Sequence, residues 1–211
     1  MSNKTKQAAI VWATFQEKEQ ITDEQLELFK RYASFLLETN KDMNLTAITE
    51  LTGVVRQHFR DSLALRKFVD LGKLNLLVDI GSGAGFPGVP LKILYPELKV
   101  ILIEVTKKRA HFLRDLIAIL ELEDIEVCEY DWRTFLRIVE ADVDMFVTKA
   151  ALAPAELARA FKPGCRYKQV PIVYWAAKSW EPDEVIAPFV QRVEKYKLGY
   201  RERKLVFLSK S

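Results

Sequence analysis

Cysteine and long apolar runs are both scarce in this chain. Its two cysteines, Cys128 and Cys165, have neither the spacing of a zinc site nor the density of a disulfide scaffold. The first six residues, Met-Ser-Asn-Lys-Thr-Lys, lack the apolar core of a signal peptide. No run approaches the roughly 18 apolar residues that a membrane span requires. We therefore expect a cytoplasmic protein with reduced cysteines, no bound metal and no membrane partner.

The chain also lacks a strong charge of either sign. It has 32 Lys and Arg residues against 29 Asp and Glu residues, a formal net charge of +3. An RNA-binding surface would therefore have to come from local clustering of basic side chains. A hydrophobic content of 49% over 211 residues suffices for one substantial core. We expect a single domain and a monomer, with an N-terminal helical extension over residues 1–70 and an α/β core over residues 71–211.

Glycine is concentrated in one stretch, Asp79-Ile-Gly-Ser-Gly-Ala-Gly-Phe-Pro-Gly-Val-Pro90. An apolar run at 76–78 precedes it and another at 91–94 follows, a pattern that predicts a buried strand, a glycine-rich turn and the start of a helix. Glycines at 81, 83 and 85 permit positive φ angles and keep side chains away from a bound ligand. The stretch therefore predicts a nucleotide-type cofactor site.

Two cofactors fit the spacing of these glycines. Read from Gly83, the stretch matches the dinucleotide pattern G-x-G-x-x-G, and Glu104 follows about twenty residues later. Read from Asp79, it matches D-x-G-x-G-x-G, the first motif of S-adenosylmethionine-dependent methyltransferases. An acid two residues before the first glycine would repel a pyrophosphate but attract the cationic amino-acid end of a sulfonium cofactor. We favour S-adenosylmethionine, with an NAD(P)-dependent oxidoreductase as the alternative.

Beyond residue 70 the sequence alternates between strand-like and helix-like segments. Strands separated by helices predict a parallel sheet with helices on both faces and a ligand at the carboxyl ends of the strands. A polar, turn-like segment is expected at 40–49. We expect strands at 76–80, 100–103, 125–128, 145–147, 170–175 and 204–208, and helices at 7–19, from Thr22 past Leu37, and at 50–69, 87–94, 107–120, 132–139, 154–161 and 183–190.

Three segments in this order, Asn44–Ile48, His58–Leu63 and Asp79–Leu91, resemble the RsmG (GidB) family. The most specific match is Gly-Phe-Pro-Gly-Val-Pro over residues 85–90. The resemblance implies a class I methyltransferase Rossmann-like fold, with a mostly parallel seven-stranded sheet and an N-terminal helical extension. It also implies transfer of a methyl group from S-adenosyl-L-methionine to N7 of a guanine in bacterial 16S ribosomal RNA. The partner would be that RNA or the small ribosomal subunit.

The expected cofactor site extends beyond the glycine stretch. Glu104 ends the second strand, where a carboxylate can accept hydrogen bonds from both ribose hydroxyls. Asp131 and Trp132 follow the third strand, where methyltransferases generally place an acid for the adenine amino group and an apolar residue against the ring. The full expected set is Asp79, Gly81, Ser82, Gly83, Gly85, Phe86, Glu104, Asp131, Trp132, Arg133 and Lys149.

The substrate side departs from the family pattern. Arg133 stands where relatives have a glutamate, and Lys149 stands where they have the arginine of Ser-Arg-Ala. Lysine keeps the positive charge but not the planar, bidentate geometry of arginine. A catalytically weak, ribosome-associated RNA-binding relative is therefore a further alternative. Candidates for positioning the substrate are His58, Asp61 and Lys149, and the expected RNA-binding rim comprises Arg56, Arg60, Lys107, Lys108, Arg109 and Lys178.

The expected chemistry requires no catalytic base. Guanine N7 presents a lone pair, so its attack on a sulfonium methyl group releases no proton. The protein would align the reacting atoms and exclude water. The chain also lacks the Asn-Pro-Pro-Tyr or Asp-Pro-Pro-Tyr motif of exocyclic-amine methylation and a Pro-Cys motif for pyrimidine carbon-5 methylation.

Overall fold

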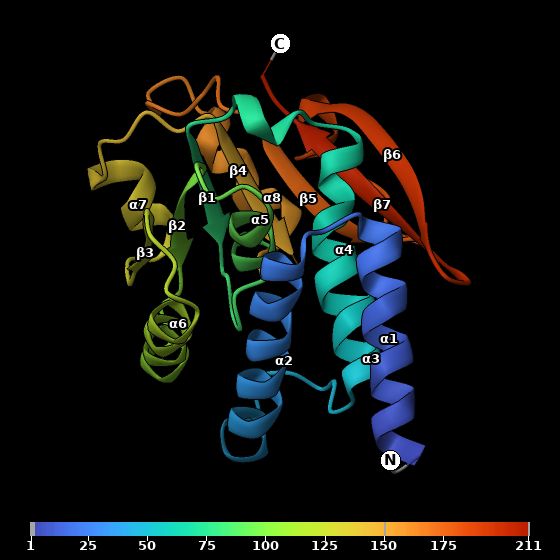
Figure 1. Ribbon diagram of the computed structural model, residues 1–211. Helices are drawn as coiled ribbons and strands as arrows, with labels where there is room; N and C mark the ends of the chain where they lie inside the picture. The colour runs from blue at the N-terminus through green and yellow to red at the C-terminus, as the bar shows by residue number, and fades with distance from the viewer. Residues whose placement is uncertain (1–2, 150, 211) are drawn as a thin grey trace.

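The computed structural model describes residues 3–149 and 151–210. Ala150, which follows Lys149, lies outside the described residues. The chain forms a seven-stranded sheet with the strand order β3-β2-β1-β4-β5-β7-β6 (Figure 1). The strands are β1 (Leu76–Ile80), β2 (Lys99–Ile103), β3 (Ile125–Cys128), β4 (Met145–Lys149), β5 (Ile172–Ala177), β6 (Val190–Leu198) and β7 (Arg201–Leu208).

The strand order reverses between β1 and β4. From β1 the chain builds outward through β2 to β3, then returns to add β4 and β5 on the other side, and β1 to β5 are all parallel. β7 is antiparallel to both β5 and β6. The mostly parallel α/β sheet expected from the sequence is confirmed. In such sheets the reversal point opens a crevice at the carboxyl ends of the strands.

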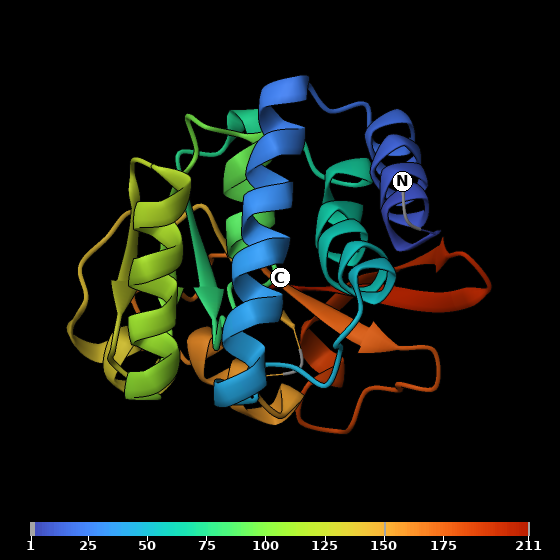
Figure 2. The ribbon, with the colours of Figure 1, turned by 60° about the horizontal axis from the view of Figure 1, so that its bottom comes forward.

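The N-terminal helices cover one face of the sheet. Helix α1 spans Asn3–Glu19 and α2 spans Asp23–Met43, with Thr22 and Gln25 forming a capping box at the start of α2. The Gln25 side chain also donates to the carbonyls of Ile93 and Leu94, at the end of α5 (Gly88–Leu94). Figure 2 shows α2 running beside α6 (Lys107–Leu120). The extension is thus anchored to the helices that follow β1 and β2.

The expected helix at 50–69 is present but irregular. It comprises α3 (Leu51–Gly53), the π-helical segment η1 (Val54–Phe59), α4 (Arg60–Leu63) and the 3₁₀ segment η2 (Ala64–Lys67). A further 3₁₀ turn, η3 (Leu71–Lys73), leads to β1. A π-helical turn widens the backbone and is often found at functional sites. Here it contains His58.

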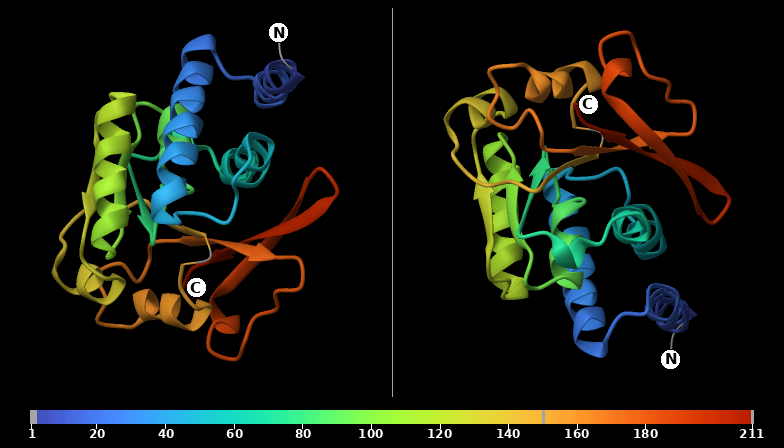
Figure 3. Two further views of the ribbon diagram at one scale, coloured as in Figure 1. Left: turned by 90° about the horizontal axis from the view of Figure 1, so that it is seen from below. Right: turned by 90° about the horizontal axis from the view of Figure 1, so that it is seen from above.

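Two hydrophobic cores lie on opposite faces of the sheet (Figure 3). Alternation along β1 sends Leu77 into the core under α2, α5 and α6 and Val78 into the core under α7 (Trp132–Ile138), α8 (Pro154–Leu157) and the 3₁₀ segment η4 (Ala158–Phe161). Helices on both faces are confirmed. Side chains of α1 and α2, such as Phe15 and Phe29, belong to the same core as Leu77. A domain boundary at residue 70 stays a prediction.

The prediction of a helix at 183–190 is wrong. Only a short 3₁₀ turn forms there, η5 (Ala187–Phe189), and β6 begins directly at Val190. Pro188 within the segment has no backbone N–H to continue a helix. The sequence did not predict β6 because this strand lies at the edge of the sheet. Most of its residues are exposed or half-buried, several of them are charged, and its pairing with β7 shifts register near Arg192.

Smaller differences occur at element ends. Helix α2 continues to Met43, through part of the segment expected to be a turn at 40–49, and the buried Asn40 side chain bonds both backbone groups of Thr46. Strand β5 begins at Ile172, two residues later than expected. Among the described residues no helix combines the length and apolarity needed to cross a bilayer.

Candidate functional site

A cavity of about 500 Å³ opens where the strand order reverses. Its walls come from the loop after β1, the end of β2, the start of α7, the end of β4 and the segment before α3. Eight of the expected cofactor residues line it: Gly81, Ser82, Gly83, Phe86, Glu104, Asp131, Trp132 and Lys149. Asp79, Gly85 and Arg133 are not among the lining residues. The glycine loop and the ends of β2 and β4 are therefore brought together as the sequence predicted.

The glycine loop has positive φ angles at Gly81, Gly83 and Gly85, and the first two of these face the cavity. Gly81 has φ +69°, and a Cβ there would lie 2.2 Å from the Cβ of Ala151. Gly83 has φ +59°, and nothing but a backbone oxygen at 4.0 Å lies near the position of its Cβ. The first glycine therefore makes room for the segment after β4. The second leaves open space on the cavity side, where a ligand can approach the backbone.

Glu104 joins the loop to the end of β2. Its side chain is buried, and its Oε2 accepts a hydrogen bond from the Gly83 N–H at 3.0 Å while Oε1 accepts one from the Thr106 N–H at 2.8 Å. A carboxylate has about four acceptor positions, so two remain after these bonds. The carboxylate is thus held rigidly at the cavity wall and keeps capacity for two hydroxyl donors.

Asp131 and Trp132 form the opposite wall. Asp131 caps α7 by accepting a hydrogen bond from the Thr134 N–H at 2.8 Å, and this bond lowers the pKa of Asp131. The Trp132 indole is buried against Phe146, with ring centroids 5.0 Å apart. Its Nε1 donates to the Glu156 carbonyl at 3.1 Å. Trp132 therefore serves both as core and as cavity lining.

Arg133 does not line the cavity. Its guanidinium pairs with Glu156 at 3.1 Å, a carboxylate that also binds Arg159 at 2.7 Å. The hydrogen bonds from Arg159, and then from Arg133, lower the pKa of Glu156 to about 2. Arg133 is thus engaged on the protein surface, and its expected role in cofactor binding stays a prediction.

Asp79 lies behind the loop. The residue is fully buried, and its Oδ2 accepts a hydrogen bond from the Gly88 N–H, the first residue of α5, at 2.8 Å. Its Oδ1 has no partner among residues 3–149 and 151–210. Burial raises the pKa of Asp79 to about 7. The acid therefore occupies the start of α5, the place where a dinucleotide-binding protein would hold a pyrophosphate.

Helix α2 reaches the loop through Tyr32, which sequence reasoning missed. The Tyr32 hydroxyl donates to the Ala84 carbonyl at 2.5 Å, and its ring stacks on Phe86 at 5.3 Å. A Cβ at Gly85 would lie 2.7 Å from the Tyr32 hydroxyl, so the missing side chain at 85 makes room for α2. In the sequence Tyr32 is one member of an apolar helical stripe, a pattern that indicates core packing and nothing more.

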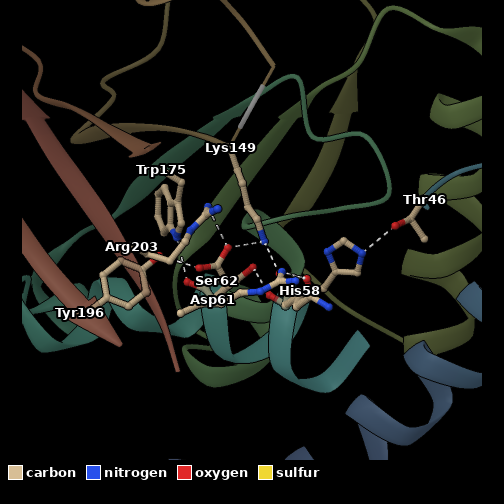
Figure 4. Close-up of polar contacts among 10 residues, drawn as sticks. Thr46, His58, Asp61, Ser62, Lys149, Trp175, Tyr196 and Arg203 are labelled. Carbon is tan, nitrogen blue, oxygen red and sulfur yellow. Dashed lines mark hydrogen bonds and ion pairs between the residues drawn. The ribbon is translucent and has the colours of Figure 1, made fainter. Parts of the chain in front are cut away.

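A buried polar network lies behind Lys149, which lines the cavity (Figure 4). The Lys149 ammonium contacts Asp61 Oδ2 at 2.9 Å and donates to the Gln57 carbonyl at 2.9 Å. Arg203 reaches the same Oδ2 at 3.3 Å, and the Tyr196 hydroxyl donates to Oδ1 at 2.6 Å. Burial lowers the pKa of Lys149, and the adjacent Asp61 opposes that shift. One carboxylate, 3% exposed, thus faces two cations.

His58 is part of the cavity wall and is uncharged at neutral pH. Its Nε2 lies 2.8 Å from the Thr46 hydroxyl, and its ring stacks on Phe86 at 4.3 Å. Burial, and then the nearby Lys149 charge, lower its pKa to about 3. Its buried Nδ1 has no partner in the described part of the chain. His58 and Lys149 thus meet at the cavity as expected, with Asp61 behind Lys149.

The residues of the expected RNA rim do not form one surface. Arg109 lines the cavity, and Lys107 and Lys108 are exposed beside it at the start of α6. Arg60 instead forms a largely buried ion pair with Glu19 at 2.7 Å, which joins α4 to α1.

Lys178 and Arg56 lie near the β6–β7 hairpin. Lys178 is exposed, with Glu202 3.7 Å from its ammonium. Arg56 lies 5.5 Å from the ring of Tyr200. Tyr196 and Arg203, which reach the site from the same hairpin, carried no sequence signal because they lie in strands whose pairing the sequence does not reveal.

Metal ligands do not gather anywhere in the part of the chain that the structure describes. Cys128 and Cys165 are both free and half-buried. The expectation that the protein works without a metal stays a prediction.

The strand order, the glycine loop and the acid at the end of β2 define a class I methyltransferase fold. The chain resembles a mutant of MtNAS crystallised in complex with S-adenosylmethionine (TM-score 0.61, 17% identity, 95% of this chain and 84% of that one). It also resembles a SAM-dependent methyltransferase from Aquifex aeolicus (TM-score 0.56, 16% identity, 78% of this chain and 97% of that one). At these identities the likeness concerns the fold.

Sequence similarity identifies the family. The family model described as GidB, rRNA small subunit methyltransferase G, matches residues 25–180, so the chain belongs to the GidB family. Ribosomal RNA small subunit methyltransferase G of Lachnoclostridium phytofermentans is 42% identical over 141 residues, which is 66% of this chain and 58% of the relative. Its counterpart from Roseiflexus sp. is 44% identical over 145 residues, 67% and 61% respectively. The chain thus spans less than two thirds of the length of these relatives.

Proposed function

We propose that this protein transfers a methyl group from S-adenosylmethionine to N7 of a guanine in small-subunit ribosomal RNA. Membership of the GidB family supports the reaction. The observation that carries the proposal is the rigidly held carboxylate of Glu104, bonded to the Gly83 N–H at the wall of a cavity at the strand-order reversal. A carboxylate at that position suits the ribose of a nucleoside-containing cofactor.

The remaining lining residues fit the other parts of the same cofactor. Asp131 would accept from the adenine amino group, and Trp132 would cover the ring. The open backbone at Gly83 would face the amino-acid end, and the Lys149 ammonium would contact its carboxylate or the RNA. When bound, the cofactor supplies an electrophilic methyl group on a sulfonium.

The alternative of a nicotinamide cofactor is disfavoured by Asp79. Its carboxylate already accepts the first N–H of α5, so a pyrophosphate would meet an acid instead of a free helix terminus.

The side chains around the cavity suit methylation of a ring nitrogen. Guanine N7 attacks with its own lone pair, so no group has to remove a proton. His58 is neutral at physiological pH because burial lowers its pKa to about 3, and with Phe86 it would present an apolar, stacked wall to the purine. Water exclusion and alignment of N7, methyl carbon and sulfur would supply the rate enhancement.

Methylation of RNA from deficient cells tests the proposal. Ribosomal RNA from cells lacking the protein is incubated with purified protein and methyl-labelled S-adenosylmethionine. We expect label at one guanine of the small-subunit RNA, released by chemistry specific for N7-methylguanine. Offering naked RNA and intact small subunits in parallel identifies the substrate form. Label on another base, or none with either substrate, would overturn the proposal.

A catalytically weak RNA-binding relative is the second candidate. It is favoured by Arg133, which pairs with Glu156, and by Lys149, which is held by Asp61. Thermal unfolding separates the three candidates, because a ligand at one hundred times its dissociation constant stabilises a protein by ~2.7 kcal/mol. Stabilisation by S-adenosylhomocysteine without turnover would favour the weak relative. Stabilisation by NADH alone would favour an oxidoreductase.

The proposed substrate also predicts where in the cell the protein works. Ribosomal RNA would be met in the cytoplasm, by a monomer that binds the RNA or the small subunit. A sedimentation measurement of the free protein tests the monomeric state.

A further inference from the structure

The tip of the β6–β7 hairpin exposes an aromatic side chain. Tyr200 is 80% exposed and follows Gly199, whose φ of +62° forms the turn between the two strands. A large aromatic side chain that is mostly exposed to water contributes little to folding. Its ring is free to contact a partner, and tyrosine is enriched at interfaces.

Strand directions place this tip at the same edge of the sheet as the cavity. β7 is antiparallel to β5 and to β6, so β6 runs in the same direction as β1, β2, β4 and β5. The carboxyl end of β6, at Leu198, and the turn after it therefore lie at the edge where the cavity opens. In Figure 1 the hairpin, in red, extends beyond the helical stretch that contains α4.

Two arginines flank the exposed ring. The guanidinium carbon of Arg56 lies 5.5 Å from the centroid of the Tyr200 ring, and that of Arg201 lies 5.9 Å from it. Arg201 also donates to the side-chain oxygen of Gln57. At these distances the guanidiniums contact the ring while most of its surface stays open to solvent.

A single residue connects this group to the cavity. Gln57 binds Arg201 through its side chain, and its backbone carbonyl accepts the hydrogen bond from Lys149, a cavity-lining residue. The exposed lysines Lys195 and Lys197 add positive charge along the same hairpin. The surface beside the cavity is therefore aromatic and basic together.

An exposed aromatic ring between cations has the chemistry of single-stranded RNA recognition. Unpaired bases stack on aromatic and guanidinium planes, and the phosphates that join them are neutralised by arginine and lysine. In a protein–protein interface the core around an aromatic side chain is depleted of charged residues. Here the neighbours of Tyr200 are charged.

We propose that Arg56, Tyr200 and Arg201 form a platform on which an unpaired base next to the target guanine stacks. The platform rests on the proposed function, because it takes RNA as the substrate. It lies partly in the hairpin beyond residue 180, where the family match ends, and it adds Tyr200 and Arg201 to the residues that the sequence singled out.

Direct RNA binding tests the platform independently of methyl transfer. The probe is small-subunit ribosomal RNA from cells lacking the protein, and its dissociation constant is measured at several salt concentrations. We expect Tyr200→Ala to weaken binding roughly 5- to 100-fold and Tyr200→Phe to bind like the wild type, because loss of one stacked base has about this effect. Arg201→Ala should lower the slope of log affinity against log salt by about 1.

Arg166→Ala is the matched control. The Arg166 side chain is 48% exposed and pairs with Glu140 and Asp142. These two acids come just before β4, so they lie at the amino ends of the parallel strands, away from the cavity. Removal of Arg166 deletes one positive charge without touching the platform, so RNA affinity should change less than twofold. Stabilisation by S-adenosylhomocysteine should be the same in all four variants.

The outcomes separate the platform from the proposed function. If Tyr200→Ala binds RNA as tightly as a wild type that binds and methylates it, the platform is refuted and the proposed function stands. If the wild type binds RNA and never methylates it, the proposed function fails, and the Tyr200 series still decides the platform. Equal losses in Tyr200→Phe and Tyr200→Ala would overturn stacking as the mode of recognition. A wild type that binds no RNA would overturn both.

Discussion

The two sides of the cavity are built in different ways. The proposed cofactor side is held by the main chain: Glu104 accepts hydrogen bonds from the backbone N–H groups of Gly83 and Thr106, and Asp131 caps the start of α7. The proposed substrate side is held by side-chain charges from segments far apart in the sequence, with Asp61 between Lys149 and Arg203. The first uses short-range backbone contacts at the ends of neighbouring strands, whereas the second exists only when α4, β4 and the terminal hairpin come together.

The two departures that the family resemblance implies lie outside the glycine loop. Arg133 pairs with Glu156 on the surface, and Lys149 contacts Asp61. At Lys149 the positive charge is kept, and Arg203 from β7 brings a guanidinium to the same carboxylate. The network therefore contains an arginine side chain, although not at position 149.

The largest effect is expected from Asp61→Ala. Removing the carboxylate leaves two largely buried cations without their partner, which should lower the free energy of unfolding by about 3–5 kcal/mol. Urea denaturation measures it. Glu38→Ala is the control, because its pair with Lys41 is exposed on both sides and should change stability by less than about 0.5 kcal/mol. A loss below 1 kcal/mol for Asp61→Ala would mean that water replaces the carboxylate easily.

Three glycine substitutions separate backbone strain, steric clash and ligand access on the cofactor side. Gly81→Ala should cost roughly 2–4 kcal/mol, because a positive φ is combined with a Cβ that lies 2.2 Å from Ala151. Gly83→Ala and Gly199→Ala have similar φ angles and no clash, so each should cost roughly 1–2 kcal/mol. Of these two, only Gly83→Ala should weaken S-adenosylhomocysteine binding. Equal binding in both would contradict the approach of the cofactor to Gly83.

The pH dependence of stability should report on Asp79. Its pKa is about 7 in the folded protein against an ordinary value of 3.8 for aspartate, so the folded state holds a proton that the unfolded state releases. Stability from this group is complete below pH 3.8 and is lost as the pH rises toward 7. Between pH 5 and 7.5, wild type should lose on the order of 2 kcal/mol relative to Asp79→Asn, which does not titrate.

The difference between wild type and variant is needed because His58 acts in the opposite direction. Its pKa is lowered to about 3, so the unfolded state takes up a proton below about pH 6.5 and stability falls as the pH drops. This contribution is common to both proteins and cancels. A difference that does not change between pH 5 and 7.5 would show that Asp79 is already ionised in the folded protein at pH 5.

The smallest effect is expected where the N-terminal extension touches the loop. Tyr32→Phe removes the hydrogen bond to the Ala84 carbonyl and should cost about 1 kcal/mol. It should also weaken cofactor binding, because the carbonyl belongs to the cavity loop. Tyr174→Phe is the control, since the described chain offers its hydroxyl no hydrogen-bond partner. Equal effects in chemical denaturation would argue that α2 packs on the loop without positioning it.

Much of the fold could be predicted because it rests on local patterns. The apolar run at 76–80, the glycine loop after it and the helix at 107–120 all lie where their sequence signals placed them. The edge strand β6 could not be predicted, because its charged residues and half-exposed face resemble a surface segment. Tyr32 and Arg203 could not be assigned to the site, because their side chains reach it only through packing between distant elements.

The sequence by itself determined the glycine loop, the acid at the end of β2 and the α/β alternation, because each depends on residues that are neighbours along the chain. Only the tertiary structure decided that Asp79 is buried at the start of α5, that Asp61 is shared by Lys149 and Arg203, and that Tyr200 stands at the edge where the cavity opens. The first depends on burial, and the other two depend on contacts between segments more than fifty residues apart. Such contacts are fixed by the packing of the whole chain and leave no local pattern in it.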